Sequence, residues 1–218
     1  MTAMKCRQTD QHEARCGVAR LEAMAENYNA AFASRWPGSR LHVDGGYILG
    51  CWYCGTSFKK AALYGMYPTT YLPRVLALFA HVPPDRLLHC PSGLVEGPGV
   101  TVDLTRYSDT CPQVIASADE LPFEDGRFDL ILSDPPYSDK DAKQYGTGHY
   151  PLGRSLVEFH RVLAPGGMVG LLHTMHPPAR VRAKGVKVGY KLRGFITVLC
   201  GFSKRTRLLT LMQKVSST

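Results

Sequence analysis

The sequence predicts an α/β protein built on a doubly wound, mostly parallel sheet with a C-terminal antiparallel hairpin, and three observations predict it. Short runs that are apolar throughout recur along the chain, which is typical of strands buried on both faces of a parallel sheet. Each run is followed by turn residues or by a helical stretch. The chain then closes with two apolar runs on either side of SKRT, residues 203–206, which is typical of a hairpin.

The apolar runs themselves are the expected strands. The five runs that we expect to be parallel strands are residues 86–90, 99–104, 114–117, 128–134 and 167–175. Residues 47–53 (YILGCWY) predict one more short strand or extended segment. The length of 218 residues fits a single domain with a substantial core.

Three segments have the pattern of helices. Residues 10–35 contain no proline, and apolar side chains recur there at three- to four-residue spacing. Residues 68–86 predict a helix that two prolines end. The side chains that we expect on its buried side are Val75, Leu76, Leu78 and Phe79. Residues 151–167 predict a helix that ends in a Pro-Gly-Gly turn. We divide the chain into an N-terminal helical extension, residues 1–46, and one domain, residues 47–218.

The net charge of +8 is unevenly distributed along the chain. No acid follows Glu158, so residues 159–218 carry eleven Lys and Arg and no compensating charge, whereas residues 1–158 carry 15 basic residues against 18 acids. This asymmetry predicts a polyanion, such as a nucleic acid, bound to the C-terminal part. The alternative is that basic residues protect exposed strands or keep them soluble. A surface designed for solubility would mix charges of both signs, which favours the polyanion.

The cysteines and the apolar content indicate a cytoplasmic protein. Seven irregularly spaced cysteines fit reduced thiols better than a disulfide framework. No apolar run is long enough for a membrane span, and the first residues have no apolar core of a secretory signal. Cys51 and Cys54 form a lone CxxC pair, and the nine residues between Cys6 and Cys16 are wide of zinc-ligand spacing, so we expect packing cysteines and no metal.

Polar residues gather where three of the predicted strands end. Ligands of open α/β sheets bind beyond the carboxyl ends of the strands. The turn after 86–90 contains small residues that let a ligand approach the backbone. Asp103 ends the next strand, where a carboxylate can accept both hydroxyls of a ribose. Asp134-Pro135-Pro136-Tyr137 ends a third. Together they suggest a nucleoside cofactor beside a substrate that donates hydrogen bonds.

The segment ADELPFEDGRFDLILSDPPYSD, residues 118–139, resembles the class I S-adenosylmethionine-dependent methyltransferases, and within them those that methylate exocyclic amino groups of nucleic-acid bases. The helix and Pro-Gly-Gly turn of residues 156–174 are similar to this family as well, and the resemblance extends from about Tyr64 to the C-terminus. Residues 145–151 add a weaker similarity to small phage- and plasmid-borne methyltransferases. The resemblance implies a Rossmann-like fold and S-adenosyl-L-methionine as the cofactor.

The resemblance also implies roles for individual residues. Those expected to bind the cofactor are Tyr67, Thr69, His89, Pro91, Ser92, Gly93, Asp103, Leu104, Ser117 and Ala118. Asp134, Pro135, Pro136 and Tyr137 are the expected catalytic residues. The Asp134 carboxylate and the Pro135 carbonyl would accept the two N–H groups of an aromatic amine and localise its lone pair for attack on a sulfonium methyl group. Prolines fix the backbone there, and Tyr137 would stack on the target base.

The sequence departs from the family at its first motif. Only nine residues, PSGLVEGPG, separate the first two parallel strands, so the usual helix between them is expected to be missing. A satisfied core histidine is the alternative to a cofactor contact for His89. Ser117 stands where the family often has an acid facing the adenine. A DPP sequence can also simply end a strand.

The leading interpretation is a methyltransferase that acts on an exocyclic amino nitrogen of a nucleic-acid base, with DNA adenine or cytosine favoured. The residues expected to bind the nucleic acid are Tyr145, Thr147, Arg180, Arg182, Lys184, Lys187, Lys204 and Arg205. The alternatives are an RNA base methyltransferase, a degenerate cofactor fold that binds nucleic acid without turnover, and a small-molecule methyltransferase, which the basic C-terminal part disfavours. The target base and the oligomeric state stay open.

Overall fold

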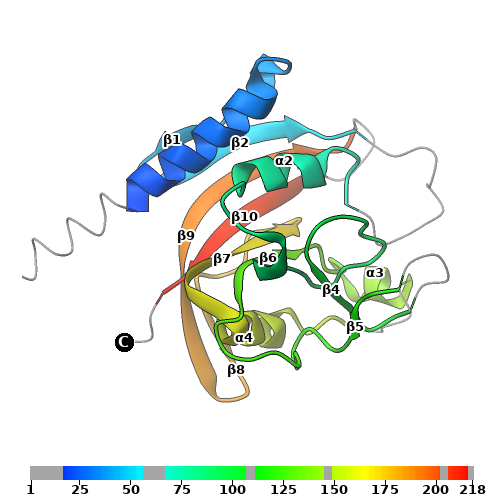
Figure 1. Ribbon diagram of the computed structural model, residues 1–218. Helices are drawn as coiled ribbons and strands as arrows, with labels where there is room; N and C mark the ends of the chain where they lie inside the picture. Colours follow the sequence, from blue (N-terminus) through cyan, green and yellow to red (C-terminus); the bar gives the residue numbers. More distant parts are fainter. Residues whose placement is uncertain (1–16, 56–66, 107–110, 145–148, 202–205, 216–218) are drawn as a thin grey trace, which may run out of the picture.

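The computed structural model describes residues 17–55, 67–106, 111–144, 149–201 and 206–215. Its main feature is one mixed sheet in the order β1-β2-β9-β10-β7-β6-β3-β4-β5, with β8 paired to β9 at one end (Figure 1). The strands are β1 His42–Asp44, β2 Tyr47–Tyr53, β3 Leu87–His89, β4 Val100–Asp103, β5 Val114–Ile115, β6 Phe128–Ser133, β7 Leu163–His173, β8 Arg180–Ala183, β9 Val186–Leu199 and β10 Arg207–Lys214. The predicted fold class is therefore confirmed.

The five predicted parallel strands form one end of this sheet, with β5 at its edge. β5, β4, β3, β6 and β7 lie side by side in that order and all run in the same direction. The chain winds outward from β3 to β5, then returns to the other side of β3 and continues with β6 and β7. The sheet therefore has its topological switch point between β3 and β6, which is where open α/β sheets bind ligands.

The C-terminal hairpin completes the sheet as predicted. β10 pairs antiparallel with β7 on one side and with β9 on the other. Beyond β9 the sheet continues with β2, which is parallel to β9, and with β1, which forms a hairpin with β2. Residues 17–46 thus contribute a strand and a helix to the same sheet and core as the rest of the described chain, and the expected boundary at residue 46 falls in the β1–β2 turn.

Helices cover both faces of the sheet. Residues 17–28 are helical and continue into the π-helical η1 (Asn29–Ala33); with α2 (Tyr71–Leu78) they cover one face, whereas α4 (Leu152–Val162) covers the other (Figure 1). The shorter helices are η2 Pro37–Ser39, η4 Pro84–Arg86 and α3 Asp139–Gln144. β6 alternates between two buried cores, since Leu130 and Leu132 pack with Tyr71 under α2 and Ile131 packs with Phe159 of α4. This double burial explains why the strands read as continuous apolar runs.

The buried face of α2 differs in part from the prediction. Val75, Leu78 and Phe79 are buried as expected, whereas Leu76 is only partly buried. Arg74 takes its place in the core, where it is 3% exposed, donates to the Tyr28 hydroxyl and lies over the Phe32 ring at 5.2 Å from the centroid. Leu76 packs against the same core from the margin of the buried face, and the helical phase turns Arg74 inward, which its charge did not predict.

The two irregular segments predicted around the parallel strands are present. Residues 90–99 contain no helix, so the helix that usually separates the first two strands is absent as expected. The Pro-Gly-Gly segment lies inside β7, where Gly166 has φ +74° and the pairing with β6 shifts register between Phe128 and Leu130. The predicted Pro-Gly-Gly turn is therefore an irregular stretch at the start of β7, and it does not end the preceding helix, which stops at Val162.

Two further expectations concern absences in the described part of the chain. The five cysteines there, Cys51 and Cys54 among them, are free thiols, and no cluster of described residues has the composition of a metal site. Cys6 and Cys16 lie outside the described residues. None of the described helices has the length and apolar character needed to span a membrane.

Candidate active site

The two acids predicted at strand ends lie at the same level of the sheet, on either side of β3. His89 is paired with Thr101 of β4 and with Leu132 of β6. Asp103 and Asp134 each follow those partners by two residues, so both stand just past the carboxyl end of β3. Two strand spacings separate their backbones by about 10 Å. The switch point between β3 and β6 therefore places both carboxylates at the same edge of the sheet.

Asp134 is engaged by two side chains. Tyr137 donates its hydroxyl hydrogen to Oδ1, and Arg207 Nη1 lies 3.2 Å from Oδ2. The side chains of Asp134 and Arg207 are 14% and 26% exposed, so this ion pair is largely shielded from water. Because a carboxylate offers about four lone-pair positions, one contact on each oxygen still leaves acceptor capacity for an amine.

Burial and these contacts act on the Asp134 pKa in opposite directions. Burial raises the pKa of the Asp134 carboxyl above its ordinary value, while the Arg207 charge and the Tyr137 hydrogen bond lower it. The hydroxyls of Tyr67 and Tyr71 are close enough for the Asp134 charge to raise their pKa values, after burial as the larger cause. The acid therefore sits in a pocket of neutral hydroxyls with one cation.

The ring of Tyr137 has neighbours that bear on its predicted stacking role. The guanidinium of Arg207 lies over the ring at 5.4 Å from its centroid, and His173 of β7 makes a T-shaped contact at 5.0 Å. A base can therefore stack on Tyr137 only on the ring face away from Arg207, or after Arg207 has moved. Burial lowers the pKa of His173, so its ring is neutral near pH 7.

Asp103 ties down the short loop that replaces the usual helix. Its Oδ2 accepts the Gly93 N–H at 2.8 Å and its Oδ1 accepts the Thr105 N–H at 3.1 Å. Asp103 is only 7% exposed. Burial raises the pKa of its carboxyl, while the hydrogen bonds from backbone N–H groups lower that pKa. Two bonds leave about two lone-pair positions, enough for the two hydroxyls of a ribose.

His89 is held at both ring nitrogens. Nε2 donates to the Pro98 carbonyl at 3.0 Å, because a carbonyl only accepts, and Nδ1 then accepts from the Tyr67 hydroxyl at 3.3 Å. His89 is fully buried, and burial lowers its pKa. This favours the alternative of a satisfied core histidine. Tyr67, expected at the cofactor, is placed by the same contact between β3 and α2.

Buried hydroxyls without a partner test whether this edge of the sheet fits a cofactor. Ser92 Oγ, beside the Asp103 loop, and Tyr71 Oη, on the Asp134 side, have no hydrogen-bond partner within the described residues. Unsatisfied buried hydroxyls are costly unless a ligand or water completes them. With the free acceptor positions of Asp103 they fit a polar nucleoside that lies across the end of β3. The residues present therefore suit S-adenosylmethionine.

The other expected cofactor residues are placed less uniformly. Ala118 is buried, whereas Leu104 is 53% exposed and Thr69 is exposed. Ser117 donates its hydroxyl hydrogen to Asp119, so the hydroxyl expected to face the adenine is used within its own turn. Pro91 is partly buried next to Ser92.

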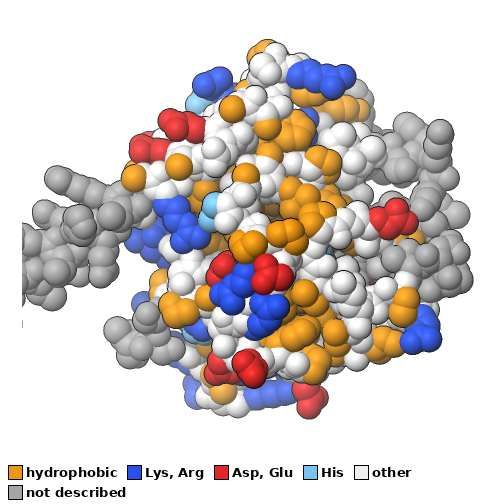
Figure 2. All heavy atoms as spheres, in the orientation of Figure 1, with side chains coloured by type: hydrophobic (Ala, Val, Ile, Leu, Met, Phe, Trp, Pro, Cys, Tyr) orange, Lys and Arg blue, Asp and Glu red, His pale blue; other side chains and the backbone are white. Residues whose placement is uncertain are grey.

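The described residues expected to bind nucleic acid lie far from the acids. Arg180, Arg182, Lys184 and Lys187 are exposed on the hairpin of β8 and β9, and basic side chains are visible there along the lower margin of Figure 2. Arg207 is paired with Val198, which is eleven residues further along β9 than Lys187. At about 3.3 Å per residue, the hairpin tip is about 36 Å along the strand from Arg207. Tyr145, Thr147, Lys204 and Arg205 lie outside the described residues.

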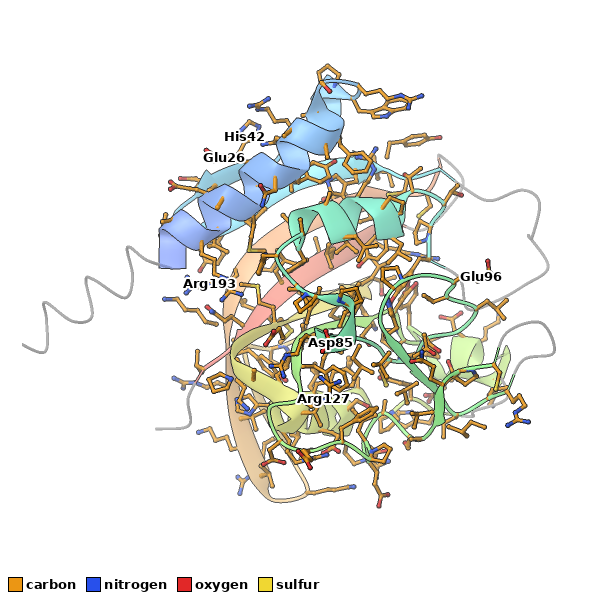
Figure 3. All side chains as sticks on the ribbon, viewed as in Figure 1. Glu26, His42, Asp85, Glu96, Arg127 and Arg193 are labelled. Carbon is orange, nitrogen blue, oxygen red and sulfur yellow. The ribbon has the colours of Figure 1, made fainter. Side chains whose placement is uncertain are left out.

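Part of the C-terminal basic charge is used inside the protein. Arg161 pairs with Glu158 at 2.6 Å and with Asp125 at 2.8 Å. Arg193 is 8% exposed and donates to Gln213 at 2.7 Å; Figure 3 shows it reaching toward the start of the helix of residues 17–28. Arg207 is also paired, and Lys184 lies 3.7 Å from Asp119, whereas Arg180, Arg182 and Lys187 of the β8–β9 hairpin are exposed.

Arg207 and Tyr150 lie near these two acids and were not among the site residues predicted from the sequence. Arg207 is separated from Asp134 by 73 positions, and one arginine among eleven basic residues carried no distinguishing signal. Tyr150 is the other, since burial raises its pKa and the Cys90 thiol and Asp103 carboxylate are near enough to add to that shift. Its place in residues 145–151, the segment similar to phage- and plasmid-borne methyltransferases, was the signal that could have identified Tyr150.

No protein-family model and no curated protein matches this chain. Among solved structures, 1,6-didemethyltoxoflavin-N1-methyltransferase of Burkholderia thailandensis matches with 14% identity over 65% of this chain and 76% of its own, at a TM-score of 0.41. A SAM-dependent methyltransferase of Aquifex aeolicus matches with 12% identity over 66% and 89%, at 0.40. TrmN of Thermus thermophilus matches with 22% identity over 72% and 52%, at 0.37. Scores of this size carry no statement about reaction or substrate.

Proposed function

We propose that this protein is an S-adenosylmethionine-dependent methyltransferase that acts on an exocyclic amino nitrogen of a nucleic-acid base, with DNA adenine or cytosine favoured. One observation supports this most strongly: Asp103 and Asp134 stand at the same level on either side of β3, at the switch point of the sheet. In this proposal Asp103 binds a ribose and Asp134 binds an amine. A cytoplasmic location remains part of the proposal.

The cofactor, when bound, supplies a methyl group already activated as a sulfonium. The chain's own residues then bind and orient. Asp103 accepts the ribose hydroxyls, and the Asp134 carboxylate with the Pro135 carbonyl accepts the amine N–H groups, which localises the nitrogen lone pair. Transfer would form the N–C bond as the S–CH3 bond of the sulfonium breaks to leave a neutral thioether, and the amine nitrogen would lose a proton. Burial raises the pKa of Asp134 and so makes its carboxylate a better acceptor for that proton.

The exposed hairpin of β8 and β9 supports a nucleic acid as the partner. Arg182 and Lys187 are directly opposite each other in the register, and Arg180 is on the same face, since side chains two residues apart share a face. Like charges directly opposite each other destabilise a strand pair, so a polyanion bound to this face would reduce the repulsion between Arg182 and Lys187. None of these three forms an ion pair within the described part of the chain. A phosphate backbone that passes both the hairpin and the acids fits this arrangement.

The test is transfer of a labelled methyl group from S-adenosylmethionine to unmethylated DNA, total RNA and free nucleosides. Asp134→Ala should abolish transfer and leave cofactor binding, measured by calorimetry, within about threefold of the wild type. Asp85→Ala is the matched control, because Asp85 is exposed before β3 at the opposite edge of the strands. Transfer to RNA alone would replace DNA by RNA in the proposal. An active Asp134→Ala variant would disprove the catalytic assignment.

A nucleic-acid-binding protein without turnover is the second candidate. It is favoured by the missing helix after β3 and by the Tyr137 and Arg207 contacts that occupy both oxygens of Asp134. Binding of DNA in the absence of any cofactor binding or methyl transfer would support this candidate against the enzyme.

A further inference from the structure

Arg207 is the cation that the fold brings to the acceptor acid. It is the first residue of β10, and its neighbour Leu208 is paired with His173, the last residue of β7. This register places the Arg207 side chain beyond the carboxyl end of β7, beside the end of β6. Among the described residues, Arg207 alone forms an ion pair with Asp134.

The contacts of Arg207 limit how Asp134 can be oriented. Nη1 holds Oδ2 at 3.2 Å, while Tyr137 holds Oδ1 and lies under the same guanidinium at 5.4 Å. The three side chains therefore form a closed triangle in which each touches the other two. Such a triangle fixes the carboxylate in one rotamer, so that its remaining lone pairs keep a constant direction.

The groups around the triangle are uncharged at neutral pH. Tyr67 and Tyr71 face Asp134 from the α2 side, Cys200 follows β9, and His173 touches Tyr137 from β7. Burial raises the pKa values of both tyrosines and of the Cys200 thiol, and it lowers the pKa of His173. Arg207 is therefore the positive charge that offsets the burial of Asp134 from inside the described chain.

We propose that Arg207 is a positioning residue of the methyl-transfer site, which keeps Asp134 ionised and aimed at the amine. This rests on the proposed function. An acid that must accept two hydrogen bonds, or later a proton, works only as the carboxylate. Burial already raises the pKa of Asp134 with Arg207 in place, so without the guanidinium Asp134 should bind its proton at a still higher pH.

The first experiment compares Arg207→Met and Arg207→Lys with the wild type in methyl transfer to DNA between pH 5.5 and 9. In Arg207→Met, kcat should fall about tenfold at pH 6 and recover toward the wild-type value at pH 9, since one opposite charge lost corresponds to about tenfold or more in the ionisation ratio. Arg207→Lys keeps the charge and should keep most of the activity at pH 6. The KM for DNA should change less than kcat.

A matched control and a second readout separate this proposal from the proposed function. Arg127→Met makes the same chemical change before the opposite end of β6, where Arg127 lies over Phe128, and should leave the pH profile unchanged (Figure 3). Carbon-13 NMR of aspartate-labelled protein, assigned with Asp134→Asn, follows the Asp134 carboxyl directly and needs no activity. Titration at a higher pH in Arg207→Met supports the proposal even in an inactive protein. An unchanged titration, or an equal loss of kcat at every pH, would overturn it.

Discussion

The Asp103→Asn substitution tests whether the acid holds the loop that stands in place of a helix. Asp103 accepts the N–H groups of Gly93 and Thr105 at 2.8 and 3.1 Å. An amide keeps one acceptor oxygen and turns an NH2 group toward the other N–H, so one charge-assisted bond is lost at a cost of about 1.5–3 kcal/mol. For a chain of this size each kcal/mol corresponds to about 2–4 °C, so the Tm should fall by about 3–12 °C.

The assay is thermal unfolding without cofactor, followed by calorimetry with S-adenosylmethionine. Asp85→Asn, at an exposed position, should unfold at the wild-type temperature. Because Asp103 also offers the ribose acceptors, cofactor binding should weaken by about 10- to 100-fold, which corresponds to the same 1.5–3 kcal/mol. A variant as stable as the wild type would show that Asp103 does not anchor the loop. Unchanged cofactor affinity would separately remove the ribose assignment.

Two further predictions concern the sheet and its basic hairpin. Gly194→Ala places a Cβ 2.7 Å from the Ile48 carbonyl oxygen, so the free energy of unfolding, measured with denaturant, should fall by about 3 kcal/mol. Gly189→Ala is the control, because its Cβ would be 3.2 Å from a flexible valine side chain, and it should lower the free energy of unfolding by less. Equal losses in the two variants would refute the packing argument. Arg182→Glu with Lys187→Glu should weaken DNA binding and make the slope of log affinity against log salt shallower by about 2, whereas an unchanged slope would exclude phosphate contacts there.

The candidate site was predictable to the extent that it depends on strand ends. Asp103 and Asp134 each end an apolar run, and the parallel winding of such runs brings their carboxyl ends to one edge. His89 shows the limit of that reasoning. It also ends a strand, yet both ring nitrogens are taken by Tyr67 and Pro98, and neither partner is apparent from local sequence.

Long-range contacts decided the burial and the role of residues that local sequence does not distinguish. Arg74 is buried although its charge predicts exposure, because Tyr28 and Phe32 of the N-terminal helical segment receive its guanidinium. The eleven basic residues after Glu158 form one uninterrupted excess in the sequence. In the fold, some neutralise acids or fill the core, and others stay on the β8–β9 hairpin.

The sequence by itself determined the fold class, the positions of the parallel strands along the chain and the end of β6 at the Asp-Pro-Pro-Tyr segment, since continuous apolar runs, turn residues and prolines act over a few neighbouring positions. Only the tertiary structure decided that Arg207 and Tyr137 hold Asp134, that β2 joins the sheet beside β9, and that the basic hairpin lies about 36 Å along β9 from the acids. These depend on strand register between distant segments. Register is set by the packing of the whole sheet and leaves no local trace.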